Sequence, residues 1–456
     1  MQDVSAIVKT QRDYFSSRRT LEIPFRADAL KRLKSSIINH EQEILDALKS
    51  DLNKSPFEAY ATEVGIILDE IGFAVKNLKS WSKPKHVHTP IVHFPSRSRI
   101  FSEPYGVVLI MSPWNYPFQL TLAPLIGAIA GGNCAVVKPS AYSPATSSII
   151  AKLLEESFAQ GHVAVIEGGR QANQALLEQK FDYLFFTGSA AVGKNVMEAA
   201  SKHLTPVSLE LGGKSPCIVC ADADIDLAAR RIIWGKTLNA GQTCVAPDYV
   251  LVQRAVKPQL IERMKHYITE FFGDNPCKNE EFPKIINEKH FIRVSGYLSC
   301  GTVAAGGETD AQALKISPAI LTDVSWDQPV MQEEIFGPVL PVIAFDDTGE
   351  AINLIIGRPK PLALYLFTKS KRTQAEITDR VSFGGGCIND TIVHLATPYM
   401  PFGGVGESGM GGYHGKYSFD TFTHKKSILQ KSNILDIKLR YPPYRGKFAL
   451  LKKLMG

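Results

Sequence analysis

The chain has 456 residues, of which 45% are apolar and 21% charged, and its formal net charge is +6. These totals are typical of a soluble globular protein with two or three domains, and the charge permits anionic ligands but does not indicate nucleic-acid binding. Seven scattered cysteines predict a reducing compartment. Residues 1–9 contain no apolar run of the kind found in signal peptides, so we expect a cytoplasmic protein.

The N-terminal part of the chain is predicted to be helical. Apolar residues near helical spacing predict one amphipathic helix over residues 27–52. The sequence Ser-Pro-Phe-Glu at 55–58 is a capping-box pattern with proline at the first helical position, and a second helix follows it to about Trp81. Residues 83–102, rich in Pro, His and Ser, predict an extended hairpin arm.

Strands and helices alternate from Gly106 onward. Strands are predicted at 107–111, 135–138, 163–167 and 183–187, and helices at 118–130, 144–159 and 190–203. This alternation predicts a parallel sheet covered by helices on both faces, the arrangement of a Rossmann-like nucleotide-binding domain. A second α/β run contains strands at 250–253 and 340–345 and a helix at 257–272.

The fold class expected is therefore α/β, with a Rossmann-like cofactor domain, a second α/β domain that would be catalytic and a small β arm for oligomerisation. The predicted boundaries are 1–82 and 103–208 for the first domain, 209–390 for the second, 83–102 and 391–430 for the oligomerisation and bridging region, and 431–456 for a basic tail. The tail is too short to span a bilayer. Contact with a membrane surface is the less favoured interpretation, and packing on a neighbouring subunit is the alternative.

Three patterns indicate less than they first suggest. Residues 188–194 look like a phosphate-binding loop, but Asn195 stands where a magnesium-binding Ser or Thr is required, so only diphosphate binding at a helix N-terminus remains. The G-x-G-x-x-G at 404–409 has no strand before it and no helical pattern after it, and we interpret it as a mobile loop. Cys217 and Cys220 lie in an apparent strand, where residues three apart face opposite sides, so we expect no disulfide and no metal site.

Cys244 is the strongest candidate for a reactive residue. It lies in Gly-Gln-Thr-Cys-Val-Ala-Pro at 241–247, a segment too broken by small residues to be the interior of a helix or strand. A lone cysteine is more often a buried structural residue, so the other motifs in the chain must show whether Cys244 is reactive. Four motifs accompany it: Pro-Trp-Asn-Tyr-Pro at 113–117, Phe-Thr-Gly-Ser at 186–189, Leu-Glu-Leu-Gly-Gly-Lys at 209–214 and Glu-Glu-Ile-Phe-Gly-Pro at 333–338.

In this order the motifs closely resemble those of the aldehyde dehydrogenase superfamily. The run from Asn389 to Lys416, with Pro-Phe-Gly-Gly-Val-Gly at 401–406, is similar to the class 3 branch, which handles fatty and aromatic aldehydes and is commonly dimeric. The resemblance implies oxidation of an aliphatic or aromatic aldehyde to the carboxylic acid with NAD or NADP. It also implies a homodimer.

The resemblance implies a role for each motif residue. Cys244 would attack the aldehyde to form a thiohemiacetal and then a thioester, Asn115 and the Cys244 backbone N–H would hold the oxyanion, and Glu210 would activate the hydrolytic water. The residues implied to bind the cofactor are Trp114, Lys138, Gly188, Ser189, Gly193, Leu211, Glu334 and Phe336. The substrate pocket is expected to include Tyr60, Tyr116, Thr243 and His394.

One position departs from the family pattern and leaves the cofactor preference open. The family usually has Glu three positions after the residue that matches Lys138, where this chain has Ala141. Without that carboxylate a 2′-phosphate is not repelled, so we expect both NAD and NADP to be used, unless Glu167 supplies the carboxylate. Two alternatives to the main function are a CoA-acylating dehydrogenase, which Glu210 argues against, and a non-enzymatic dinucleotide-binding protein.

Overall fold

The strands predicted after Gly106 form a six-stranded sheet in the order β17-β7-β6-β3-β4-β5. The computed structural model describes residues 3–455. In sheet order the strands are β17 (Gly409–Met410), β7 (Val207–Glu210), β6 (Tyr183–Thr187), β3 (Val107–Met111), β4 (Cys134–Lys138) and β5 (Val163–Val165). All neighbours are parallel except β17, which pairs antiparallel with β7. The predicted Rossmann-like sheet is therefore confirmed.

Both faces of this sheet are buried, because alternate side chains of β3 enter different hydrophobic clusters. Val108 and Ile110 pack in a cluster with helices on one face, and Val107 and Leu109 pack with helices on the other. The first face is covered by α2 (Ile23–Asn39), α3 (Glu41–Leu52), α5 (Gly65–Trp81), α6 (Gln119–Gly131) and α7 (Pro144–Ser157). The second is covered by α1 (Val4–Ser16), α8 (Arg170–Leu177) and α9 (Ala190–Ser201).

The single helix predicted over 27–52 is wrong. Two helices, α2 and α3, meet at His40, whose φ of −111° and ψ of 19° lie outside the helical region. The His40 N–H still donates to the Ser36 carbonyl at 3.1 Å, which ends α2 before α3 begins. Apolar spacing continues across the break, and Leu33 and Leu48 both stay in the core, so periodicity alone could not show the turn.

A short segment links α3 to α5 and matters for the site. It consists of α4 (Pro56–Ala59) and a π-helical turn at Tyr60–Val64. Ser55 Oγ accepts the Glu58 N–H at 3.2 Å, as the capping pattern predicts. The Glu58 carboxylate does not complete a capping box, because it accepts the N–H of Asn239 instead. Single π-helical turns are frequent at functional sites.

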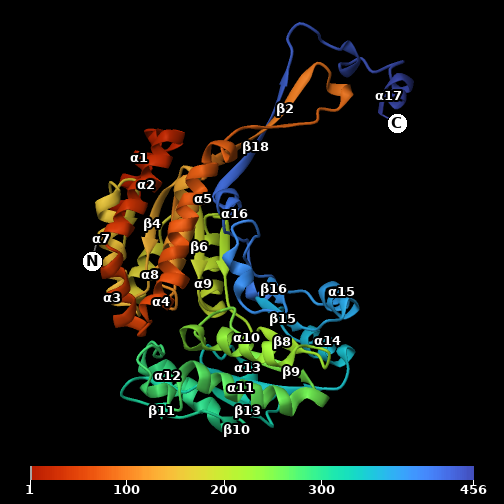
Figure 1. Cartoon of the computed structure of the whole chain (residues 1–456). Helices are drawn as coiled ribbons and strands as arrows, with labels where there is room; N and C mark the ends of the chain where they lie inside the picture. The colour runs from red at the N-terminus through yellow and green to blue at the C-terminus, as the bar shows by residue number, and fades with distance from the viewer. Residues whose placement is uncertain (1–2, 456) are drawn as a thin grey trace.

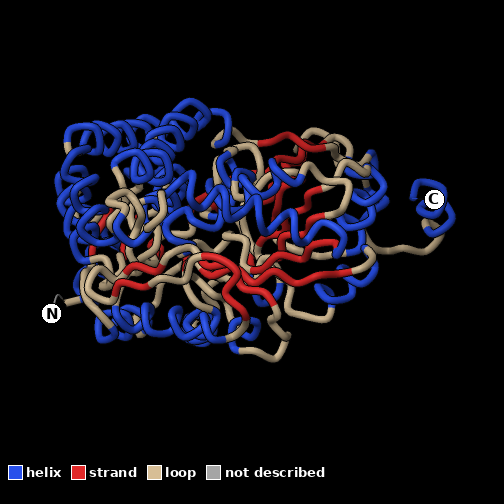
Figure 2. Tube along the Cα trace, turned by 60° about the horizontal axis from the view of Figure 1, so that its bottom comes forward, coloured by secondary structure: helices blue, strands red, loops and turns tan. Residues whose placement is uncertain are grey.

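The second sheet has seven strands in the order β10-β13-β14-β9-β8-β15-β16. They are β10 (Thr302–Ala305), β13 (Ala319–Thr322), β14 (Val339–Phe345), β9 (Tyr249–Gln253), β8 (Pro216–Val219), β15 (Ala363–Phe367) and β16 (Gly385–Ile388). Only the β10–β13 pair is antiparallel. Helices α10 (Ile225–Thr237), α11 (Lys257–Phe272), α12 (Glu288–Gly296), α13 (Pro329–Gln332), α14 (Thr348–Ile356) and α15 (Lys371–Arg380) accompany it, with a small hairpin of β11 (Thr309–Asp310) and β12 (Lys315–Ile316). Figure 2 shows helices on the outside of both groups of strands.

Cys217 lies on β8 of the second sheet, and Cys220 follows the end of that strand. Cys217 and Cys220 pack into separate hydrophobic clusters on opposite sides of β8, and all seven cysteines, which lie within the described residues, carry free thiols.

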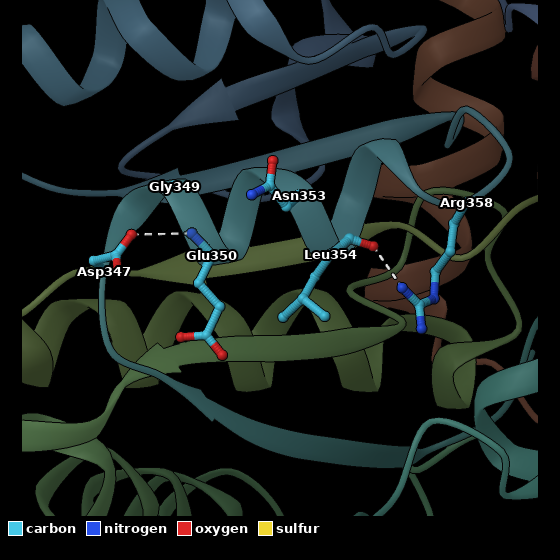
Figure 3. Close-up of a pocket in the computed structure, with 6 residues that line it drawn as sticks. All are labelled: Asp347, Gly349, Glu350, Asn353, Leu354 and Arg358. Atoms are coloured by element: carbon cyan, nitrogen blue, oxygen red, sulfur yellow. Dashed lines mark hydrogen bonds between the residues drawn. The ribbon is translucent and has the colours of Figure 1, made fainter.

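On the outer surface, Asp347 caps α14 by accepting the Glu350 N–H at 3.0 Å, and Arg358 donates to the Leu354 carbonyl at 2.6 Å (Figure 3). The residues that line the groove here belong to none of the sequence motifs described above.

The predicted arm projects from the body as a three-stranded antiparallel sheet (Figure 1). It consists of β1 (Lys85–Val87), β2 (Ser96–Pro104) and β18 (Thr423–Lys431), and β2 pairs with β18 from Pro104↔Thr423 to Ser96↔Lys431. Helix α16 (Lys416–Thr421) leads into β18, and α17 (Phe448–Met455) lies beyond the arm. Across residues 3–455, no helix has the length and apolar character needed to span a membrane.

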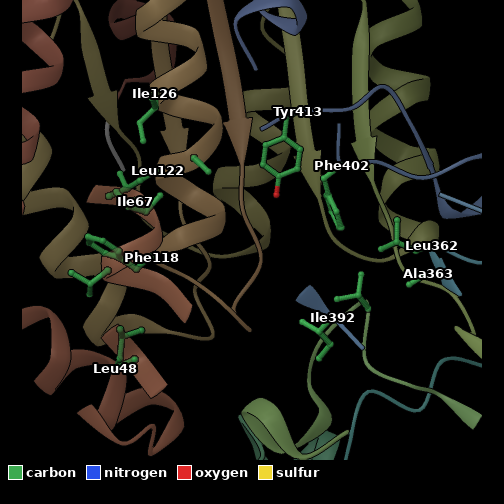
Figure 4. Close-up of a cluster of buried hydrophobic side chains, with 14 of the residues drawn as sticks. Leu48, Ile67, Phe118, Leu122, Ile126, Leu362, Ala363, Ile392, Phe402 and Tyr413 are labelled. Carbon is green, nitrogen blue, oxygen red and sulfur yellow. The ribbon is translucent and has the colours of Figure 1, made fainter. Parts of the chain in front are cut away.

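The core is continuous between the two α/β units. Phe118 and Leu122 of the first unit and Leu362 and Ala363 of the second belong to a single buried cluster (Figure 4). The run at 404–409 was predicted to be a mobile loop, and this is only partly right. Its last residue begins the strand Gly409–Met410 (β17), which pairs with the edge of the first sheet next to Glu210. The junction between the units is therefore where the predicted site residues lie.

Candidate active site

The Cys244 loop begins with an unusual backbone. After α10, Asn239, Ala240 and Gly241 have φ values of 51°, 51° and 74°, so three successive residues are left-handed. A Cβ atom on Gly241 would lie 2.3 Å from the carbonyl oxygen of Gly337, which explains the glycine. This turn places Cys244 half-buried in the wall of a cavity. Strain of this kind is typical of functional loops.

Asn115 and Cys244 are brought together, as predicted. The Asn115 side-chain amide donates to the Gln242 carbonyl at 3.0 Å, and the Asn115 carbonyl accepts the Asn239 side-chain amide at 2.7 Å. The neighbouring Tyr116 hydroxyl lies 2.7 Å from the Thr243 hydroxyl oxygen. Because Gln242 and Thr243 immediately precede the cysteine, these bonds fix the loop after β3 against the reactive loop.

Glu210 ends β7 with a carboxyl group that is buried and unpaired. The residue is 2% exposed, and neither carboxylate oxygen has a hydrogen-bond partner among residues 3–455. Burial raises the pKa of Glu210 well above its usual value. Burial also raises the pKa of the Cys244 thiol, with smaller contributions from the charges of Glu334 and Glu210. The cysteine and the two carboxyl groups therefore form one electrostatically coupled site.

Glu334 lies over the glycine pair that follows Glu210. A Cβ atom on Gly212 would lie 2.0 Å from Glu334 Oε2, so the carboxylate needs a glycine there. The pKa of Glu334 is raised to about 8, chiefly by burial and then by Asp248, while the Gly213 N–H hydrogen bond acts in the opposite direction. Its Oε1 atom is buried without a partner in the described part of the chain, which leaves an acceptor for a bound ligand.

Trp114 and Phe336 meet edge to face, with ring centroids 5.3 Å apart. His290 of α12, which sequence reasoning missed, lies 5.2 Å from the Trp114 ring. Phe336 is held at a φ of 50°, a rare value for an aromatic residue. These three rings give the site an aromatic wall suited to stacking on a planar group. The sequence around His290 contains no signal for a ligand site. Its spacing of three residues from Arg293 is ordinary in a helix.

The residues predicted to bind a diphosphate lie at the strand–turn–helix unit Thr187–Ala190. Ser189 Oγ accepts the Val192 N–H at the start of α9, so this N-terminus is capped and aimed outward from β6. A Cβ on Gly193 would lie 2.8 Å from Leu211 Cδ2, and one on Gly188 would lie 2.6 Å from the Phe186 ring. The two glycines let α9 lie close to β6 and β7, which is the packing that a helix N-terminal phosphate site requires.

Lys138 ends β4 and is 3% exposed, with Nζ donating to the Pro139 carbonyl at 2.6 Å. Burial lowers the pKa of Lys138 to about 8, and the charge of Glu167 acts in the opposite direction. Glu167 is therefore close enough to influence this corner. Ala141 is exposed in the turn that follows.

The cavity at Cys244 has a volume of about 410 Å³ and a mostly apolar wall. Its walls include Tyr116 and Thr243, as predicted. The predictions for the other two residues are wrong: Tyr60 packs its ring on Gly65 and is 43% exposed, and His394 contacts Cys387. Lining residues that sequence reasoning missed are Phe57, Glu58, Trp234, Phe271, Phe272, Phe402, Tyr413 and His414. They come from five separate segments, and no local pattern joins them.

The fold and site define a two-unit α/β oxidoreductase with a cysteine between a dinucleotide-type sheet and an apolar cavity. Comparison with known proteins agrees. The aldehyde dehydrogenase family model matches residues 1–428. The 4,4′-diaponeurosporen-aldehyde dehydrogenase of Staphylococcus aureus is 50% identical over 441 residues, covering 96% of each chain, and the aldehyde dehydrogenase family 3 member H1 of Arabidopsis thaliana is 47% identical, covering 99% of this chain and 95% of that protein. A solved structure described as the substrate-bound state of Staphylococcus aureus AldH has a TM-score of 0.98 and 48% identity, with 100% of both chains covered.

The chain belongs to the aldehyde dehydrogenase family. It is an aldehyde dehydrogenase that oxidises aldehydes to carboxylic acids with NAD or NADP, and its relatives include family 3 members from plants and mammals. The resemblance to the class 3 branch is thus confirmed, and the non-enzymatic alternative is set aside.

Proposed function

We propose that Cys244 is the nucleophile of this oxidation and that the aldehyde occupies the cavity of about 410 Å³ beside it. The single observation that carries the proposal is the meeting of Cys244, Asn115 and an unpaired Glu210 at one junction. Two of them lie at the carboxyl ends of parallel strands, where open α/β sheets bind ligands. The apolar wall favours an aliphatic or aromatic aldehyde over a charged one.

The residues divide the chemistry as follows. Cys244 must lose its proton before it attacks the aldehyde carbon, because the thiolate is the nucleophile. Attack forms a thiohemiacetal on the sulfur, and the Asn115 amide and the Cys244 N–H would stabilise its oxyanion. Bound NAD or NADP supplies the hydride acceptor. Once the thioester has formed, Glu210 would take a proton from water as that water attacks the thioester carbon, and the acid would leave with Cys244 as leaving group.

The residues present fit a dinucleotide. The unpartnered Glu334 Oε1 is an acceptor for a ribose hydroxyl, the Trp114–Phe336 pair offers an apolar wall, and the α9 N-terminus at Ser189 offers N–H groups to a diphosphate. Lys138 would lie near the adenosine ribose. With Ala141 in place of a carboxylate, we propose that NADP is used at least comparably to NAD.

Replacing the cysteine tests this proposal. Cys244→Ser should lose essentially all dehydrogenase activity while binding NAD with unchanged affinity, because a hydroxyl is a far weaker nucleophile. Cys387→Ser is the matched control, since Cys387 is the other half-buried cysteine among the described residues. Near-wild-type turnover by Cys244→Ser would refute the assignment. A screen of aldehydes by chain length, followed by absorbance of the reduced cofactor, would define the substrate.

We also propose a homodimer in a reducing compartment such as the cytoplasm. The strand β2 is paired along its length with β18, which leaves the short strand β1 as one edge of a projecting arm, and Ile91, Val92 and Phe94 on the arm are exposed. The seven free thiols support the compartment. Light scattering at micromolar concentration should give the dimer mass, and a monomer mass would exclude the assembly.

A further inference from the structure

A buried ion pair lies behind the reactive loops, outside every motif that identified the site. Lys54 and Glu63 are both 0% exposed, and Lys54 Nζ lies 2.5 Å from Glu63 Oε1. Burying two charges is costly unless each makes further good contacts. The hydrogen bonds that this pair makes to other residues go to the loop after β3 that carries Asn115 and to the start of α6.

Lys54 holds the residue proposed to bind the oxyanion. Its Nζ donates to the Asn115 backbone carbonyl at 3.2 Å and lies 3.9 Å from the centre of the Tyr116 ring. The Asn115 carbonyl also accepts the Asn239 side-chain amide at 2.7 Å, so one oxygen joins Lys54 to the Cys244 loop. Through the Tyr116 hydroxyl the same lysine is linked to Thr243, the residue before the cysteine.

Glu63 holds the other end of the same loop. Its Oε2 accepts the backbone N–H groups of Phe118 and Gln119 at 2.9 and 3.2 Å. These are among the first N–H groups of α6, where a carboxylate is favoured by the helix dipole. Glu63 lies in the π-helical turn at Tyr60–Val64, where it is buried.

A third carboxylate from the same segment holds the reactive loop itself. Glu58 Oε1 accepts the backbone N–H of Asn239 at 2.7 Å. Asn239 is the first of the three left-handed residues, so its backbone needs support. Segment 54–63 thus contacts the loop that carries Asn115 at two points and the loop that carries Cys244 at one.

We propose that Lys54, Glu63 and Glu58 are positioning residues that fix the Asn115 amide relative to the Cys244 sulfur. The inference rests on the proposed roles of Asn115 and Cys244. None of the three needs to touch the reacting atoms. Their effect is geometric, because a displacement of about 1 Å at an oxyanion donor lowers the rate of attack by about 100-fold.

The test separates stability from rate. Lys54→Met alone leaves Glu63 as an unpaired buried charge, so it should lose both thermal stability and activity. The double variant Lys54→Met with Glu63→Gln removes both charges and keeps an amide oxygen for the N–H groups of Phe118 and Gln119. It should regain stability, yet its burst of reduced cofactor at saturating aldehyde should remain about 100-fold slower than in wild type. Its affinity for NAD, measured by titration, should be unchanged.

A second variant keeps the test decisive if the double variant does not fold. Glu58→Ala removes the acceptor for the Asn239 N–H and also shortens one side chain of the cavity wall, so its burst is measured at saturating aldehyde, where it should slow while NAD affinity stays the same. The matched control is Arg12→Met with Asp182→Asn, a pair at the opposite end of β3, where Asp182 accepts the Val107 N–H at 2.8 Å. This control should keep the wild-type burst rate.

Two outcomes overturn the inference. A double variant that regains both stability and burst rate would show that the pair only supports the fold. A wild-type burst rate in Glu58→Ala would show that Glu58 has no positioning role. Both results are distinguishable from failure of the proposed function, because Cys244→Ser would still be inactive. Activity in Cys244→Ser would instead refute the nucleophile assignment, whatever the positioning variants do.

Discussion

Replacing Gly212 by alanine tests whether Glu334 must lie where the structure places it. The new Cβ atom would lie 2.0 Å from Glu334 Oε2, whereas ordinary contacts begin at 3.4 Å, so the carboxylate must move by more than 1 Å. Gly212 lies outside the left-handed region, so alanine fits its backbone. The obstacle is the far end of a flexible side chain, and we therefore expect the fold to tolerate the change.

The magnitude follows from the bond that would be lost. Above pH 8, where Glu334 is ionised, a hydrogen bond to its charged carboxylate contributes about 1.5–3 kcal/mol, and losing the one to a ribose hydroxyl should weaken NAD binding about 10- to 100-fold. We expect a comparable fall in kcat/KM for the cofactor, while the free energy of unfolding stays within about 1 kcal/mol of wild type.

Titration of the intrinsic fluorescence with NAD and NADP would measure this change. Gly213→Ala is the matched control, because its Cβ would meet the Leu362 nitrogen at an ordinary 3.4 Å and should leave the dissociation constant unchanged. If Gly212→Ala binds both cofactors within twofold of wild type, the assignment of Glu334 to a ribose hydroxyl of the cofactor is wrong.

Three further predictions follow from the buried groups and the departure at Ala141. Glu210→Gln should still show a burst of reduced cofactor followed by slow turnover; loss of both in a folded protein would place Glu210 before hydride transfer. Ala141→Glu should shift kcat/KM toward NAD; an NAD-selective wild type, unchanged by this substitution, would point to Glu167. Burial lowers the pKa of His162 to about 4, so its neutral form stabilises the fold above pH 6.5 and this stability falls as the pH drops toward 4. His162→Phe should remove on the order of 3 kcal/mol of that acid sensitivity in denaturant titrations, and an unchanged pH dependence would contradict the shift.

Much of the first sheet could be predicted from sequence, because its strands are short apolar runs with helices between them. Val107–Met111 and Tyr183–Thr187 are observed with the predicted bounds. Buried parallel strands have this uniform apolar pattern. The arm could be predicted for the opposite reason, because residues 83–102 have no apolar periodicity that would bury one side of a helix or strand.

The residues around the reaction were predicted only where a motif carried them. Asn115, Glu210 and Cys244 stand in distinctive short sequences, and the structure brings them together. Lys54 and Glu63 stand in no such sequence, because their proposed function depends on an ion pair between residues nine positions apart, of which only Glu63 lies in the π-helical turn. An ordinary helix would place Glu63 elsewhere, and periodicity assumes an ordinary helix.

The cavity wall was the least predictable part. Tyr60 and His394 have side chains of a kind that often line substrate pockets. In the structure, however, Tyr60 packs against Gly65 and His394 contacts Cys387. Whether a side chain faces a cavity is decided by packing between segments far apart in the sequence, here Phe57, Trp234 and Phe271 among others. Local sequence contains no record of those contacts.

The central claim is that Cys244 carries the acyl group, and the mass of the trapped enzyme tests it most directly. Glu210→Gln, mixed with an aldehyde and NAD and then quenched in acid, should retain an acyl group because hydrolysis is slow. Peptide mapping should place the added mass on Cys244, hydroxylamine should remove it, and omission of NAD should prevent it. An acyl group on another residue, or a burst of reduced cofactor without any acylated peptide, would contradict the account.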